Sequence, residues 1–149
     1  MVSTQGINAY NKVGVESNIA GASPHDLIIM LYQAAIDSVG NARRQILQQE
    51  VAAKGASISR AISLIGSGLQ ASLDREAGGE IAQNLFDLYS YMVQRLVQAN
   101  INNDIAILDE VERLLTDLLG AWESIKRPAS QDAGFQPASN RVAMTYDRL

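Results

Sequence analysis

Hydrophobic residues recur along this chain at the spacing of an α-helix, and in residues 24–49 they cover more than one helix face. Ser23 stands where a helix cap is expected, Pro24 suits the first turn, and Asp26 occupies the acidic position of a capping box. The apolar residues fall into two stripes: Leu27, Leu31, Ala34 and Ala35, and beside them Ile28, Tyr32, Ala35 and Val39. An ordinary surface helix needs one stripe. The second stripe therefore predicts contact with other helices, with a partner, or with both.

Three further segments repeat apolar residues with helical period, and we expect helices over about 55–73, 80–99 and 104–127. The glycines at the end of 75–79 predict a loop there, and the asparagines of 100–103 predict the next turn. Short connections between long helices favour antiparallel neighbours. The expected fold is all-α, an antiparallel four-helix bundle with a short N-terminal cap segment.

The bundle should occupy residues 23–127, because Pro128 ends the last helix. Residues 1–22 are polar with isolated apolar positions and suggest an irregular arm that caps the bundle. Residues 128–149 combine two prolines with serine, glutamine and scattered charges, which is typical of a disordered tail.

Composition narrows the classes of function. The chain has 149 residues, 47% of them hydrophobic, which suits one domain with a real core. A net charge of −4 argues against nucleic-acid binding. The longest apolar run, 27–32, is far too short for membrane insertion, and no secretory signal opens the sequence. The absence of cysteine fits a cytoplasmic location.

No motif predicts an enzyme, a metal site or a bound cofactor. The single histidine, His25, rules out the paired Glu-x-x-His motifs of di-metal bundles, and a surface position is expected for it. Capping explains its neighbours Ser23 and Asp26 better than a hydrolase triad does. Gly66, Gly68 and Ala71 match a loose dinucleotide pattern, but inside a helical segment they predict close helix packing or a kink.

Tyr32 and Tyr89 have two interpretations. Each follows a leucine, and taken alone each is best explained as packing in the core or at its boundary, with the hydroxyl reaching water. The surplus of apolar rows on the first and third helices also allows a groove that binds another helix. A bundle that self-associates as a homodimer through these faces is the alternative.

The sequence also resembles the flagellin export chaperone family, FliS. The resemblance covers roughly residues 1–126 in the right order. Its motifs are Ala9-Tyr10, Val15-Glu16-Ser17, Ser23-Pro24-x-x-Leu27-Ile28-x-Met30-Leu31-Tyr32, Gly78-Gly79-Glu80-Ile81-Ala82-x-Asn84-Leu85-x-x-Leu88-Tyr89-x-Tyr91-Met92, Ala99-Asn100 and Ala121-Trp122.

The resemblance implies a cytoplasmic chaperone that binds the disordered C-terminal region of flagellin. Such a chaperone prevents premature polymerisation and assists delivery to the flagellar export apparatus, with the export gate as a second partner. We expect the groove to be formed by Tyr32, Ile62, Ile65, Leu85, Tyr89, Met92, Val93 and Leu96. Ile7 and Tyr10 are the expected cap over it. The alternative is a structural or adaptor bundle that self-associates through its apolar faces.

Overall fold

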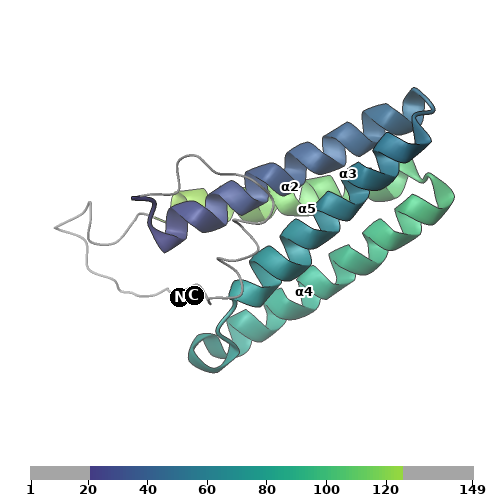
Figure 1. Cartoon of the computed structure of the whole chain (residues 1–149). Coiled ribbons are helices and arrows are strands. Elements are labelled where there is room, and N and C mark those ends of the chain that lie inside the picture. The colour runs from purple at the N-terminus through teal and green to yellow at the C-terminus, as the bar shows by residue number, and fades with distance from the viewer. Residues whose placement is uncertain (1–20, 126–149) are drawn as a thin grey trace.

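The computed structural model describes residues 21–125, and every regular element in that range is helical (Figure 1). The prediction of an all-α fold is therefore confirmed. The elements, in chain order, are α2 (Pro24–Leu47), α3 (Val51–Ser63), the π-helix η1 (Leu64–Leu69), the 3₁₀ turn η2 (Gln70–Ser72), α4 (Arg75–Asn102) and α5 (Ile105–Ser124).

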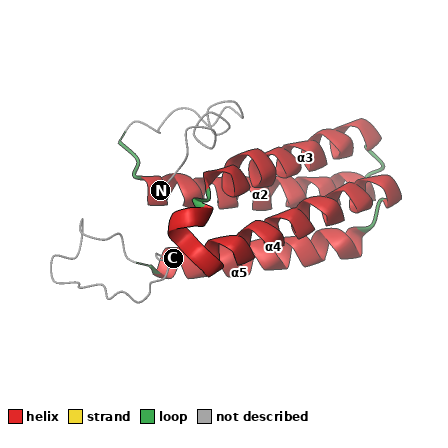
Figure 2. Ribbon diagram, turned by 90° about the horizontal axis from the view of Figure 1, so that it is seen from below, coloured by secondary structure: helices red, strands yellow, loops and turns green. Residues whose placement is uncertain are grey.

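The four long helices lie side by side, and each runs against its neighbour in the chain (Figures 1 and 2). Helix α2 packs on α3 and α5, and α4 packs on the same two helices. The bundle is thus closed, with α2 and α4 on one diagonal and α3 and α5 on the other. One hydrophobic core fills its centre with side chains from all four helices.

Helix starts follow the caps that the sequence offers. The Ser23 hydroxyl accepts from the Asp26 backbone N–H at 3.1 Å, and the Asp26 carboxylate accepts from the Ser23 N–H at 3.3 Å. This confirms the predicted capping box. Asp74 and Asp104 cap α4 and α5 in the same way, each accepting from the backbone N–H three residues on.

Two expected boundaries were wrong. Helix α3 begins at Val51, four residues before the expected start, and the supposed loop 75–79 is helical up to its last residue. The Asp74 cap explains the second difference, because it starts a helical turn that only Gly79 interrupts. Gly79 has φ 59° and ψ −136°, a conformation open essentially to glycine alone.

The glycines of the second helix mark both close packing and an irregular turn, as predicted. The helix widens into η1 at Leu64–Leu69. A Cβ on Gly68 would lie 3.0 Å from Leu31 Cδ2, so α2 and this segment approach too closely for a side chain. His25, expected at the surface, is half-buried, and its ring centroid lies 5.8 Å from that of Trp122. The expected arm and tail lie almost wholly outside the described residues.

Candidate partner-binding site

The structure separates the eight predicted groove residues into two groups. Five of them have no surface to offer a partner, because they are buried in the core: Tyr32, Ile65, Tyr89, Met92 and Leu96. The other three are half-buried: Ile62, Leu85 and Val93. The prediction of an open groove through the first group is therefore corrected. Their apolar rows meet one another across the bundle.

Tyr32 and Tyr89 show why a polar side chain can occupy that core. Their hydroxyl oxygens lie 2.5 Å apart, and the two rings are tilted with centroids 6.4 Å apart. Removal from water raises the pKa of both phenols, so both remain neutral donors and acceptors. The pair links α2 to α4 across the bundle. Of the two interpretations from the sequence, core packing is confirmed, but the expectation that the hydroxyls reach water is wrong, because both are buried and bond to each other.

Exposed apolar surface lies instead along the contact between α3 and α4. On α3 the row Val51, Gly55, Ile62 and Gly66 follows helical spacing, and on α4 Val93, Val97 and Ile101 do the same. The two rows meet at Gly66, where a Cβ would lie 3.9 Å from Val93 Cγ2. We call Val51, Ile62, Val93, Val97 and Ile101, with the two glycines, the apolar strip.

The strip is exposed to solvent, and its side chains are short. Val51, Val97 and Ile101 are 67%, 45% and 75% exposed, whereas large apolar residues normally prefer burial. Gly55 has open space where a side chain would stand. A row of valines, isoleucines and glycines can receive a second helix at short distance, because no long side chain holds it away.

Ion pairs join α2 to α5 and α4 to α5. Arg43 of α2 donates to Asp109 at 2.8 Å and also to Glu112 of α5. Arg95 of α4 donates to Glu110 at 2.9 Å.

Glu110 also accepts the hydroxyl of Tyr91 at 2.5 Å. This hydrogen bond, and then Arg95, lower the pKa of Glu110, while the carboxylate raises the pKa of Tyr91. These contacts place charged and polar groups along α5 and leave little apolar surface there for a partner.

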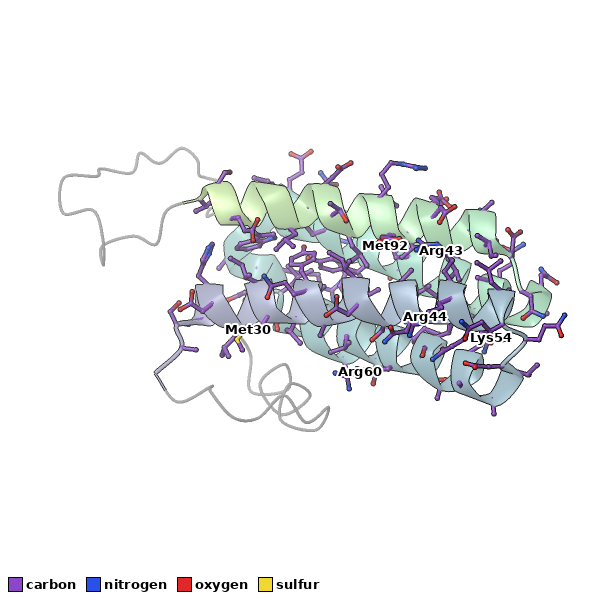
Figure 3. All side chains as sticks on the ribbon, turned by 90° about the horizontal axis from the view of Figure 1, so that it is seen from above. Met30, Arg43, Arg44, Lys54, Arg60 and Met92 are labelled. Atoms are coloured by element: carbon purple, nitrogen blue, oxygen red, sulfur yellow. The ribbon has the colours of Figure 1, made fainter. Side chains whose placement is uncertain are left out.

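At the end of the bundle where α2 joins α3, the strip meets a pocket of about 410 Å³. Its lining includes Glu50, Val51, Lys54 and Asn103. Lys54, labelled in Figure 3, lies on α3 and is only 6% exposed. Its ammonium donates to the backbone carbonyl of Asn100 at 2.8 Å and to the side-chain oxygen of the same residue at 2.7 Å.

The sequence carried a signal for Lys54 that the predictions missed. Lys54, Ile58, Ala61 and Ile65 are spaced at i, i+4, i+7 and i+11, so the lysine stands at a core position. Val51 was missed because the helix was expected to begin at residue 55. Ile7 and Tyr10, the expected cap, lie outside the described residues.

Within residues 21–125 no group of acidic or histidine side chains could hold a metal ion. No helix in that range is long and apolar enough to cross a membrane.

The chain matches the family described as "Flagellar protein FliS" over residues 6–129. It is 48% identical over 130 residues to "Flagellar secretion chaperone FliS" of Salmonella typhimurium, which covers 87% of this chain and 96% of that relative. The Escherichia coli protein of the same name is 41% identical, with the same two coverages. "Flagellar secretion chaperone FliSB" of Pseudomonas aeruginosa is 40% identical over 84% of this chain and 98% of its own length.

Proposed function

The chain belongs to the FliS family of flagellar secretion chaperones, and we propose that it binds the C-terminal region of flagellin in the cytoplasm. In this role it prevents premature polymerisation of flagellin and assists its delivery to the export apparatus, with the export gate as a second partner. The observation that supports the proposal is the apolar strip along α3 and α4, because a chaperone for an amphipathic segment needs apolar surface that its own fold leaves uncovered.

The strip suits a partner that gains helix as it binds. An apolar face of such a helix presents residues at i, i+3, i+4 and i+7, which match two parallel rows of small aliphatic side chains. Ile62 and Val93, half-buried at the base of the strip, would contact the deepest side chains of the partner. Val97 and Ile101 would cover its flank.

A chaperone must also release its substrate. Ordering a disordered segment costs conformational entropy, which offsets part of a large contact area and keeps the complex reversible. The proposal retains Ile7 and Tyr10 as a removable cap, on the sequence alone.

The test is calorimetry with a synthetic peptide that spans the C-terminal region of flagellin. We expect one peptide per chain, a gain of helical circular dichroism and a negative heat-capacity change. No heat and no co-elution at tens of micromolar would overturn the proposal. A dimer of the free protein that the peptide does not dissociate would favour the self-associating bundle instead.

A further inference from the structure

The apolar strip is short for a partner that binds as a helix. On α4 it runs from Val93 to Ile101, which corresponds to about 12 Å or roughly two helical turns. Helical segments shorter than about 12–15 residues are marginal in water unless packing stabilises them. A partner that gains helix on the strip would therefore be held more firmly if apolar surface continued beyond Val93.

The row on α4 does continue, as far as Phe86. Phe86, Ser90, Val93, Val97 and Ile101 are spaced at i, i+4, i+7, i+11 and i+15, so they share one side of the helix. The whole row spans about 22 Å. Phe86 is half-buried, but among the described residues it is not one of those that pack against the hydrophobic core. Part of its ring is therefore covered from outside the core.

The end of the second helical segment reaches the same point. The Gln70 side-chain nitrogen donates to the Phe86 carbonyl at 2.9 Å and to the Ser90 hydroxyl at 2.7 Å. These hydrogen bonds hold η2 against α4, so the two segments still lie side by side at Phe86. A partner that follows the contact between α3 and α4 past Val93 therefore reaches Phe86 next.

The group that covers the Phe86 ring is Arg75. Its guanidinium carbon lies 4.0 Å from the ring centroid, which is a cation–π contact. In a continuous helix, residues 75 and 86 would be about 16 Å apart along the axis. The contact forms because Gly79 interrupts the helix, so that the first turn of α4 folds back toward the row.

Only the arginine side chain would have to move to uncover the ring. The folded-back turn itself is closely packed, since a Cβ on Gly78 would lie 2.6 Å from Ala82 Cβ. Arg75 is exposed and forms no ion pair within the described part of the chain. A cation–π contact at an exposed site is weak. The guanidinium is therefore a cover that a partner can displace while the turn stays in place.

We propose that Phe86 is a further apolar contact for the bound flagellin segment, and that an apolar side chain of this segment replaces the Arg75 guanidinium on the ring. The inference rests on the proposed function and lengthens the surface that performs it. An apolar side chain removes ring area from water more completely than a guanidinium, which must keep its charge hydrated. The displaced guanidinium moves into solvent.

Two variants should have effects of opposite sign on the dissociation constant of the flagellin peptide, measured by calorimetry. Arg75→Ala removes the competitor for the ring, so the peptide should bind about threefold more tightly. Phe86→Ala removes the contact itself and should weaken binding about tenfold. Arg113→Ala is the matched control, since it removes an exposed arginine on α5 and should leave the affinity unchanged.

The Phe86 ring can also be observed directly. The chain contains two phenylalanines, Phe86 and Phe135. Incorporation of 4-fluorophenylalanine therefore gives two fluorine resonances, which Phe135→Leu assigns. The Phe86 resonance should shift in Arg75→Ala, and it should shift in the unmodified protein when the peptide is added to saturation. This measurement stands even if Phe86→Ala folds poorly.

The outcomes separate this inference from the proposed function. If Arg75→Ala binds the peptide as the unmodified protein does, or less tightly, the arginine does not compete for the ring and the inference is overturned. A Phe86 resonance that the bound peptide does not shift would also overturn it, and would leave the proposed function intact. Failure of the peptide to bind the unmodified protein would overturn the proposed function, and this inference with it.

Discussion

The α2–α5 side and the α3–α4 side of this bundle hold their helices together by different means. Arg43 joins α2 to α5 through two carboxylates. Between α3 and α4 there are instead glycines, small aliphatic residues and a lysine paired with an amide. Among the described residues, the exposed large apolar side chains of α2 and α5 lie only at the helix ends, Leu47 on α2 and Ile125 at the C-cap of α5. Three of the other exposed ones lie on the apolar strip.

This difference separates stability from recognition. Partly exposed ion pairs typically contribute about 0–1 kcal/mol each, but they cover a helix contact with polar groups and leave little for an apolar partner. The strip carries the opposite arrangement, in which apolar surface remains in water until something covers it. Substitutions on the two sides should therefore change different measurements.

The largest effect is expected on the strip itself. Val97→Glu places a charge among apolar side chains, and we expect it to weaken binding of the flagellin peptide on the order of thirtyfold. Ile81→Glu is the matched control, because Ile81 is on the same helix and is similarly exposed, at 47% against 45%. It lies roughly 160° away around the helix axis.

The control should change the affinity by less than about twofold. Both variants should keep the melting temperature of the unmodified protein, since both positions are exposed. If both substitutions weaken binding equally, the peptide does not discriminate between the two sides of α4, and the apolar strip is not the specific binding surface.

The next effect distinguishes two glycines that are two residues apart. Gly68→Ala should lower the free energy of unfolding by about 1–2 kcal/mol, because its Cβ would press on Leu31 in the core. Gly66→Ala meets only an ordinary contact with Val93. It should therefore leave the free energy of unfolding unchanged or slightly raise it. Peptide affinity should fall about threefold, because the added methyl group would hold the peptide farther from the strip.

Urea denaturation and calorimetry on the same preparations would measure both quantities. A loss of stability in Gly66→Ala as large as that in Gly68→Ala would mean that the strip is part of the core.

The helical architecture could be read from the sequence, because periodicity and caps are local properties. Ser23 with Asp26 predicts the start of α2, and the helical spacing of apolar residues identifies all four helices. The loop expected over 75–79 was four residues too long, since the Asp74 cap starts a helical turn that continues up to Gly79.

The candidate site was less accessible for a physical reason. Periodicity shows which residues share a face, but not which other element covers that face. Tyr32 and Tyr89 are 57 positions apart and satisfy each other, so their rows are core rather than groove. The acceptor of Lys54 is 46 positions away. That pairing could not be inferred from a core-spaced lysine alone.

The tyrosine pair tests whether the bundle interior contributes to binding. Tyr32→Phe removes the hydroxyl that bonds to both Tyr89 and Trp122 in the core, and we expect a loss of about 1–2 kcal/mol in the free energy of unfolding. The double variant with Tyr89→Phe should lose less than the sum of the two single variants, because it leaves neither hydroxyl of the pair unsatisfied. Peptide affinity should not change. A fall in affinity without a fall in stability would return these two residues to the binding surface.

The smallest effect is expected where Tyr91 and Arg95 hold Glu110 between α4 and α5. The folded state lowers the pKa of Glu110, chiefly through the Tyr91 hydroxyl. The carboxylate therefore stabilises the fold fully above its unfolded pKa of about 4.3, and this contribution disappears as the pH falls through the lower folded value. Tyr91→Phe removes the larger cause of that shift.

The variant should accordingly be slightly less stable than the unmodified protein at neutral pH, and the difference should vanish in acid. Denaturation midpoints measured from pH 7 down to pH 3 would follow this change, and NMR titration should show a higher pKa for Glu110. Tyr91 is also an exposed aromatic side chain on α4. The same variant therefore tests whether the peptide binds only at the apolar strip or also at the α4–α5 contact. If Tyr91→Phe weakens peptide binding while leaving the acid dependence of stability unchanged, the α4–α5 contact is a recognition surface as well, and stability and binding are not separated as proposed.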